Sequence, residues 1–472
     1  MKKICLIVMT ALIAFNLTAC STDKARQNPE SDNNFEGNTA NSTGNLSEGE
    51  NDEKTTIHIS IDKSNRFLEV AEKKFEELHP GIKVEIKEYI TPGEIMRIDA
   101  NTLVGKVSNG DPDESKEKYI NNINTELMSG QGADIISVRM LPYKKYISRN
   151  MFADIKKLME SDKDYEEAKY YSNIFEAVQF NNGLYTIPLD YTYQLLGGNA
   201  ELDIDDSKWN WNDFFSAAQK NSSGTSSETR KKYILLDTDE DIFNLIFEKS
   251  YSRFVNEEGK KSSFMSDEFI KLLTLCKELS DKKHVRQNST KISKDDMGQS
   301  MFYIYDIASL SSLASIEASE PVKSLLRLPS NVKAGDTAFS SSMLFAVNNA
   351  SKSKTAAWKF IKFLLSDEMQ SSPALPGFPI NKAAYKQKII SETEQFSQNT
   401  SINLSKDKKT GLMNKYAVFA DSVAQDINSY PYADSQILKI VKEEVRAFFL
   451  GKTSARDAAQ AIQNKVDIYL KE

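Results

Sequence analysis

Polar and aromatic side chains stand directly after two predicted strands of this sequence. Asp62 follows the segment 56–61, and Arg139 and Tyr143 follow the apolar segment 133–138. Open α/β sheets bind ligands at the carboxyl ends of their strands, where charged groups can hold hydroxyls and an aromatic ring can stack on a sugar. These residue types favour noncovalent binding of a polar solute. A helix N-terminal charge at Asp62 and a surface ion pair at Arg139 are the plainer alternatives.

Residues suited to catalysis are present, but their spacing does not favour an enzyme. The acidic pairs are Asp205-Asp206, Glu257-Glu258 and Asp295-Asp296. Each pair is contiguous in sequence, whereas glycoside hydrolysis needs two carboxylates facing each other across a cleft. The histidines are His58, His79 and His284. They lack metal-ligand spacing, and the sequence has no nucleophile elbow, phosphate loop or HExxH motif. We therefore expect no enzyme activity, no metal and no cofactor.

The N-terminus predicts export and lipid anchoring. A cationic start precedes an apolar run, 4–15, which is too short to span a membrane, and Leu-Thr-Ala-Cys follows at 17–20. That run resembles the bacterial lipobox, whose cysteine is acylated. Residues 1–19 are therefore predicted to be a lipoprotein signal peptide, and Cys20 the lipidated residue. An ordinary signal peptide with a chance cysteine is the alternative.

Composition separates a tether from a globular body. Segment 20–55 is rich in Asn, Ser, Thr, Glu, Asp and Gly and is predicted to be a disordered tether. The remaining body of about 415 residues exceeds what one core supports, so two domains are expected. A formal net charge of −7 argues against nucleic-acid binding. If Cys20 is acylated, Cys276 has no disulfide partner, and we expect it to be a buried thiol on a helix.

Hydrophobic periodicity predicts an α/β protein. A strand over 56–61, a helix over 65–78 and a strand over 82–86 form a β-α-β unit, which implies a parallel sheet. Further strands are predicted at 133–138, 193–196, 301–305 and 342–347. Further helices are predicted at 119–128, 152–159, 241–254, 267–280, 354–365, 434–450 and 454–470, with another starting at an N-cap on Asn212. The polar segment 105–117 is expected to be a loop.

Seven segments carry a family resemblance. They are 56–86, 123–138, 181–190 (NNGLYTIPLD), 209–220 (WNWNDFFSAAQK), 345–370 (FAVNNASKSKTAAWKFIKFLLSDEMQ), 377–382 (GFPINK) and 449–466. Together, and in this order, they resemble family 1 of the bacterial extracellular solute-binding proteins, the maltose-binding type. The resemblance spans nearly the whole mature chain, and segment 345–370 is its most specific part. The insertion 97–118 has no counterpart in the family.

The resemblance implies a two-lobe, periplasmic-binding-protein-like α/β fold of type II. Such a chain crosses between its lobes three times, here near 188–193, 328–331 and 377–379. The implied lobes are 56–189 with 331–377 and 190–330 with 378–472. A ligand would bind in the cleft between them, and hinge closure around it would form the surface that a permease recognises.

The resemblance also implies ligand contacts beyond Asp62, Arg139 and Tyr143. These further candidates are Asp190, Tyr191, Tyr193, Tyr305, Phe339 and Ser341. The first crossing would bring Tyr191 and Tyr193 to the cleft floor on the same side of the chain, and Tyr305 lies where the family places an aromatic residue near its site. Core packing of the tyrosines and a plain loop at 339–342 are the alternatives. We expect Trp209, Trp211 and Trp358 in the core.

The resemblance implies capture of a small-molecule solute, most often a carbohydrate, and its delivery to the transmembrane subunits of an ABC importer. The chain would act as a monomer, without nucleic acid, held through Cys20 on the extracellular face of the membrane of a single-membrane bacterium. Two alternatives stay open. The same fold serves in ligand sensors or co-receptors of signalling systems, and the solute need not be a sugar.

Overall fold

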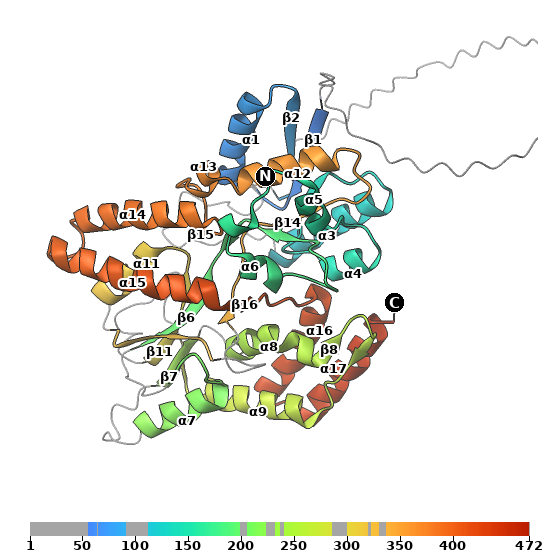
Figure 1. Ribbon diagram of the computed structural model, residues 1–472. Coiled ribbons are helices and arrows are strands. Elements are labelled where there is room, and N and C mark those ends of the chain that lie inside the picture. Colours follow the sequence, from blue (N-terminus) through green and yellow to red (C-terminus); the bar gives the residue numbers. More distant parts are fainter. Residues whose placement is uncertain are drawn as a thin grey trace, which may run out of the picture. The chain divides into compact units, whose positions relative to one another are not determined.

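The computed structural model describes residues 55–63, 65–90, 112–198, 205–222, 232–236, 240–285, 300–319, 322–329 and 337–471. The predicted signal peptide, Cys20, the tether up to residue 54 and residues 97–111 of the insertion lie outside these ranges. Residues 52–472 form one compact unit, which is shown in Figure 1.

A five-stranded sheet near the start of this unit confirms the predicted β-α-β opening. Its order is β2 (Ile82–Glu88), β1 (Thr55–Ile61), β3 (Ile135–Ser137), β14 (Leu344–Val347) and β4 (Ile187–Pro188). The first three strands are parallel, and β14 runs antiparallel to β3 and β4. Helix α1 (Arg66–Leu78) joins β1 to β2. Its first turn is capped by Asn65, whose Oδ1 accepts a hydrogen bond from the Phe67 amide at 2.8 Å.

A second five-stranded sheet contains the middle of the chain. Its order is β10 (Lys283–Val285), β7 (Lys232–Leu236), β11 (Ser300–Ile307), β6 (Tyr193–Gly198) and β12 (Ser324–Arg327). Strands β10, β7 and β11 are parallel, and β6 pairs antiparallel with β11 and β12. Gly198 allows β6 to approach β11 closely, because a Cβ there would lie 2.0 Å from the Met301 carbonyl oxygen.

Segments at the first and third predicted crossings pair with each other, and the first also contacts Ser340, which lies beyond the second predicted crossing at 328–331. The two-residue strand β5 (Asp190–Tyr191) pairs antiparallel with β15 (Phe378–Pro379), and Thr192 forms an isolated bridge with Ser340. Gly377 is required beside β5, because a Cβ there would lie 2.7 Å from the Tyr191 carbonyl oxygen. The short strands β13 (Thr337–Ala338) and β16 (Ile427–Ser429) pair in parallel next to this region.

Helices pack around both sheets. Among the described residues, the helices between β2 and β12 are α3 (Pro112–Met128), α4 (Tyr143–Ser148), α5 (Ile155–Ser161), α6 (Ser172–Ala177), α7 (Trp211–Ser222), α8 (Asp241–Phe254), α9 (Asp267–Asp281) and α11 (Leu310–Ser319), with a 3-10 turn at Glu167–Lys169. Those after β14 are α12 (Lys354–Leu364), α13 (Asp367–Gln370), α14 (Lys382–Gln398), α15 (Lys406–Asp426), α16 (Ser435–Phe449) and α17 (Ala455–Tyr469). A small hairpin, β8 (Val255–Asn256) and β9 (Lys261–Ser262), follows α8. Within the described ranges, every helix is too short or too polar to span a bilayer.

The core confirms several sequence predictions. Trp209, Trp211 and Trp358 are all at most 4% exposed, and Cys276 is a fully buried free thiol on α9. The strongly amphipathic helix α12 buries Trp358, whose indole N–H donates to the Asp162 carboxylate at 2.8 Å. Burying an indole is favourable when its N–H finds such a partner.

Two local predictions were wrong. Asn210, not Asn212, caps α7, because its Oδ1 accepts hydrogen bonds from the amides of Asn212 and Asp213 at 2.9 and 3.2 Å. The segment 105–117 is not wholly a loop, since α3 already begins at Pro112. Proline is well suited to a first helical turn, where no intrahelical partner is needed for its missing N–H. Helices α14 and α15, which lie side by side in Figure 1, were not predicted from the sequence.

Candidate functional site

A cavity of about 360 Å³ lies where several chain segments with distant sequence positions meet. Its lining comes from α3, from the segment after β3, from β6, from the middle of α8, from residues 338–340, from the stretch that joins β16 to α16 and from α16 itself. The lining residues are Lys116, Arg139, Met140, Leu141, Tyr143, Tyr193, Gln194, Leu245, Glu248, Lys249, Ala338, Phe339, Ser340, Tyr430, Pro431, Tyr432, Ala433, Ser435, Leu438 and Lys442. Since both five-stranded sheets contribute adjoining residues, this cavity is the candidate ligand site.

Aromatic rings form much of the wall. Tyr143, at the start of α4, meets Tyr432 edge to face with ring centroids 4.7 Å apart, and Phe339 lies 5.1 Å from Tyr430. Tyr193, the first residue of β6, is stacked on the core residue Phe378 at 5.6 Å. Rings held by such contacts are rigid, and they offer flat apolar surface for stacking at little entropic cost.

Two hydroxyl groups of this wall have no hydrogen-bond partner. They belong to Tyr193 and Tyr432, whose oxygen atoms are buried and unpaired among the described residues. Burial raises the pKa of both phenols well above the usual range, so both remain neutral donors. A buried polar group without a partner costs free energy. Because these two oxygens have almost no accessible surface, a solute hydroxyl could pair with them only after the surrounding side chains move. The rings that carry these hydroxyls line the cavity and offer flat apolar surface to a ligand.

Cationic side chains converge on the same cavity. Arg139 lies after β3, Lys249 on α8, Lys116 on α3 and Lys442 on α16, and Glu248 is the one acidic residue in the lining. Burial lowers the pKa of Lys249 to about 8, although Asp306 and Glu248 oppose this shift. Lys442 lies 3.7 Å from Glu248.

Asp62 contacts Arg139 but does not itself line the cavity. Its carboxylate is 3.4 Å from the Arg139 Nη2 atom and 3.5 Å from the Ser137 Oγ atom, and the residue is 8% exposed. The Ser137 carbonyl oxygen accepts a short hydrogen bond from the Tyr119 hydroxyl, at 2.6 Å. The strand end is thus fixed by buried groups, and Asp62 is placed to orient Arg139 toward the cavity.

Asp190 and Ser341 are a buried pair next to the cavity. The Asp190 carboxylate accepts hydrogen bonds from the hydroxyls of Ser341 and Ser342 at 2.7 and 2.6 Å and from the amides of Ser342 and Met343 at 3.0 and 3.2 Å. Burial raises the Asp190 pKa, and these hydrogen bonds oppose the rise. The pair links β5 to the residues just before β14, and so it holds Phe339 and Ser340 in position.

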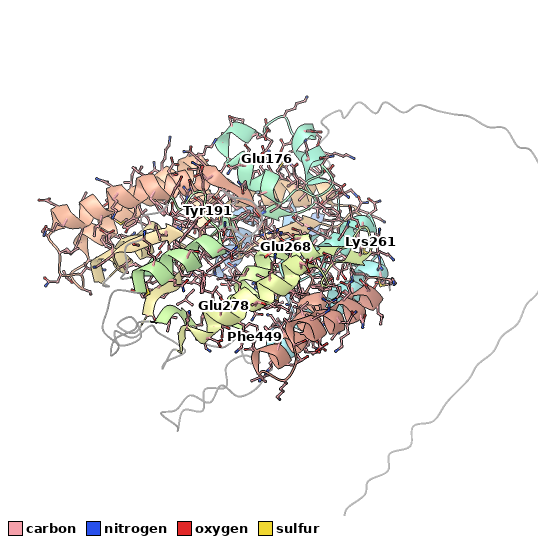
Figure 2. The ribbon with its side chains drawn as sticks, turned by 90° about the horizontal axis from the view of Figure 1, so that it is seen from below. Glu176, Tyr191, Lys261, Glu268, Glu278 and Phe449 are labelled. Atoms are coloured by element: carbon pink, nitrogen blue, oxygen red, sulfur yellow. The ribbon has the colours of Figure 1, made fainter. Side chains whose placement is uncertain are left out.

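The other two predicted site residues lie away from the lining. Tyr191, labelled in Figure 2, is fully buried and stacked on Phe378 with centroids 5.2 Å apart. Tyr305 packs over Gly197 and against Tyr303, with ring centroids 5.1 Å apart. Of the nine predicted residues, the structure brings Arg139, Tyr143, Tyr193 and Phe339 together around one cavity.

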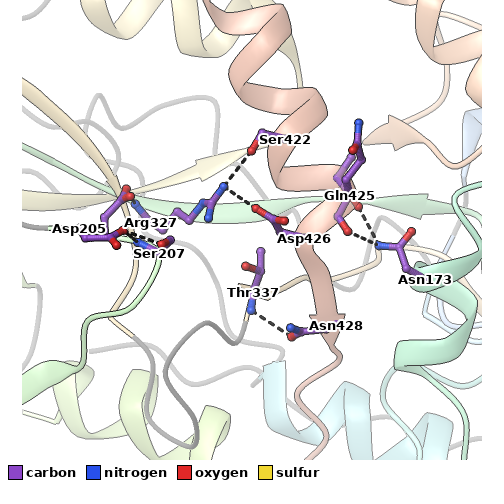
Figure 3. Close-up of polar contacts among 11 residues, drawn as sticks. Asn173, Asp205, Ser207, Arg327, Thr337, Ser422, Gln425, Asp426 and Asn428 are labelled. Atoms are coloured by element: carbon purple, nitrogen blue, oxygen red, sulfur yellow. Dashed lines mark hydrogen bonds and ion pairs between the residues drawn. The ribbon is translucent and has the colours of Figure 1, made fainter.

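The segment Tyr430-Pro431-Tyr432 and the lysines of α8 and α16 were not predicted from the sequence as site residues. Two tyrosines around a proline, between two helices, are the signal that could have indicated a rigid aromatic wall. Figure 3 shows how the chain just before this segment is fixed. The Asn173 side chain donates to the carbonyl oxygens of Ala424 and Ile427 at 2.9 and 2.8 Å, and Arg327 pairs with Asp426 at 2.8 Å.

Comparison with solved structures shows the same fold at low sequence identity. The sugar-binding protein MalE from Xanthomonas citri has a TM-score of 0.60 at 14% identity, covering 88% of this chain and 98% of that one. A periplasmic oligogalacturonide-binding protein from Yersinia enterocolitica has a TM-score of 0.56 at 17% identity, with 88% and 99% covered. The ABC substrate-binding protein Lmo0181 from Listeria monocytogenes, in complex with cycloalternan, has a TM-score of 0.53 at 17% identity, with 89% and 99% covered.

Sequence comparison identifies the family. A search of curated proteins gave no match. The family model described as bacterial extracellular solute-binding protein matches residues 106–398, which is more than half of the chain. Both the predicted resemblance and the prediction of a binding protein rather than an enzyme are thereby confirmed. The chain belongs to the bacterial extracellular solute-binding proteins.

Proposed function

We propose that this protein captures a sugar or oligosaccharide in the cavity at Tyr193 and Tyr432 and delivers it to the permease of an ABC importer. The observation that carries the proposal is one cavity of about 360 Å³ whose lining combines aromatic rings with cationic side chains. That volume lies within the range of small-ligand pockets. Solved neighbours with the same fold are described as binding cycloalternan, oligogalacturonide and sugar, which supports this solute class.

Capture would proceed by hinge closure. Residues 56–189 with 331–377 would form one lobe, and 190–330 with 378–472 the other. The paired segments around Asp190, Ser340 and Phe378 would act as the hinge, with the third crossing at 377–379. Since the cavity lining draws on both proposed lobes, closure would bury the solute and bring Arg139 and Tyr143 toward Lys249 and Tyr432.

Anchoring would hold the protein where solute arrives. Cleavage before Cys20 and its acylation would attach the chain to the outer face of the cell membrane, and segment 20–55 would let the body move above it. The permease subunits would then be reached without dissociation from the membrane.

The test is a thermal-shift and calorimetric screen of the purified protein against mono- and oligosaccharides, peptides and polyamines. We expect saccharides to raise the melting temperature and the others to leave it unchanged. Stabilisation by peptides or polyamines, and by no saccharide, would overturn the assignment.

A matched pair of variants tests the placement of the site. Tyr193→Phe removes one unpaired hydroxyl from the cavity, and it should weaken saccharide binding about tenfold, the value of one hydrogen bond of roughly 1.4 kcal/mol. Tyr165→Phe removes a hydroxyl that is also buried and unpaired but lies outside the lining, and it should leave affinity unchanged. Equal affinities in both variants would show that the solute binds elsewhere.

A further inference from the structure

The lining of the cavity has the opposite charge balance to the chain. The whole sequence has 67 acidic and 60 basic residues, whereas the cavity is lined by four cations and one acid. The cations are Lys116, Arg139, Lys249 and Lys442, and they come from four separate segments. Composition alone therefore does not account for the positive charge, which the fold assembles from distant positions.

Nearby acids offset this charge only in part. Glu248 faces Lys442 at 3.7 Å, and both side chains are more than 40% exposed, so the pair is weak. Asp62 reaches one guanidinium nitrogen of Arg139, at 3.4 Å. Asp306 accepts a hydrogen bond from Gln194 at 2.9 Å and lies outside the lining, as Asp62 does. With both of these acids included, four cations still face three acids.

The incomplete charge compensation affects Lys249 more than the other three cations. Within the described part of the chain its ammonium group has no hydrogen bond or salt bridge, and Asp306 and Glu248 act on it only through longer-range charge. A cleft that closes on a neutral sugar would remove water from this ammonium group without replacing it, which is costly. A carboxylate on the solute would replace the lost water with charge-assisted hydrogen bonds, the geometry that guanidinium and ammonium groups bind best.

We propose that the solute is an acidic saccharide, whose anionic group is bound by Lys249 and Arg139 while its ring stacks on the tyrosines. This inference rests on the proposed function, and it narrows the solute class from sugars in general to sugars that carry a negative charge. Lys116 and Lys442 would contribute longer-range attraction at the rim.

The experiment compares two forms of one ligand by calorimetry on the purified protein. Trigalacturonate and diglucuronate serve as probes, each beside its fully methyl-esterified form, which keeps the shape and loses the charge. Sialic acid and glucose 6-phosphate are tested in the same way. They show whether the site binds uronates in particular or also other carboxylates and a phosphate. We expect an acidic form to bind at least about tenfold more tightly than its neutral counterpart, with affinity that falls as salt rises. If neutral saccharides bind equally well or better, this inference is wrong while the proposed function stands. If no saccharide of either kind binds, both are wrong.

Variants locate the charge contact. Lys249→Gln and Arg139→Gln should each weaken binding of the acidic form about tenfold or more and change binding of a neutral analogue by less than about threefold. Lys271→Gln on α9 makes the same charge change at an exposed position outside the cavity, and it should have no effect. Circular dichroism melting of each variant separates lost binding from lost folding. Equal loss for charged and neutral ligands would contradict a role for these cations in charge recognition.

Discussion

Several side chains around the cavity lower the stability of the folded protein when no ligand is bound. Each buried hydroxyl that lacks a partner, as in Tyr193 and Tyr432, costs on the order of 1–3 kcal/mol relative to a paired one. The half-buried ammonium group of Lys249 adds a desolvation cost, which is why its pKa falls to about 8. Such uncompensated groups are typical of binding sites, because a ligand can return the lost interactions.

The Lys249 pKa predicts how stability changes with pH. The pKa is lower in the folded chain, at about 8, than its ordinary value of 10.5, so between these values the unfolded chain binds more protons. Stability contributed by this group should therefore rise as pH increases from about 8 to 10.5, by up to about 3 kcal/mol in total. The charged groups acting on it are Asp306 on β11 and Glu248 on its own helix, and both oppose the shift. The cations Arg139 and Lys442 line the same cavity.

Urea unfolding at several pH values, for the wild type and for Lys249→Gln, measures this contribution as the difference between the two proteins. Other groups titrate in both proteins and cancel. A difference that stays constant from pH 7 to pH 10.5 would contradict the lowered pKa.

Site residues were predicted from the sequence where they directly follow a strand. Arg139 and Tyr143 follow a recognisable apolar strand, and strand ends meet at one edge of a sheet. Lys249 lies in the middle of a helix, and Tyr432 lies between β16 and α16, where local sequence contains no information on what they face. Only the packing of α8 and α16 brings them to the cavity.

The C-terminal end of α15 and strand β16 come directly before the aromatic wall in the chain. Asn173, on α6, donates to the carbonyl oxygens of Ala424 and Ile427, which stand at the end of the helix and have no amide partner further along it. The same short stretch receives Arg327 from β12 (Figure 3). Tyr430 and Tyr432 follow within a few residues, so their positions depend on these contacts.

We expect Asn173→Ala to destabilise the protein by about 1–2 kcal/mol, because partly buried carbonyl oxygens lose their donor, and to weaken solute binding as the tyrosines lose their fixed position. Chemical denaturation and calorimetry measure the two effects. The control is Asn122→Ala, whose amide donates within α3 at an exposed site to the Lys118 carbonyl oxygen at 2.8 Å; it should change neither. Unaltered affinity in Asn173→Ala would show that the aromatic wall does not depend on this contact.

Elements with a strong apolar stripe were predicted, and those with a weak one were not. Helices α8, α9, α12, α16 and α17 match their predicted ranges to within a residue or two. Helix α15 was missed because its buried face consists of small or polar residues as well as larger ones, including Lys409, Ala420 and Ala424. Its helical state depends on packing against α11 and α14, which only the folded chain supplies.

The whole molecule combines two sheets whose strands come from non-contiguous parts of the chain. β14 joins the first sheet more than a hundred residues after β4, and the second sheet forms in between. This order of strands could be expected only from the family resemblance, because periodicity predicts the existence of strands but not their neighbours.

The anchor is tested by Cys20→Ser in the producing cell. The variant should leave the membrane fraction, because no acyl group can be attached, while its affinity for solute stays that of the wild type. Fractionation with an antibody against the body of the protein measures this, and Ser21→Ala, which keeps the acylated cysteine, should stay with the membrane. A Cys20→Ser protein that still sediments with membranes, although its mass shows that residues 1–19 have been removed, would contradict lipid anchoring.

Cys276 has a practical consequence. It is the only cysteine among the described residues, and it is fully buried, with a pKa raised by burial well above that of an ordinary thiol. Maleimide reagents react with accessible thiolates, so they would not modify Cys276. In a protein that begins after Cys20, a dye attached to a cysteine introduced at Ser340, an exposed residue of the cavity lining, would then report solute capture from a single known position. The protein can therefore be converted into a fluorescent sensor of its own ligand.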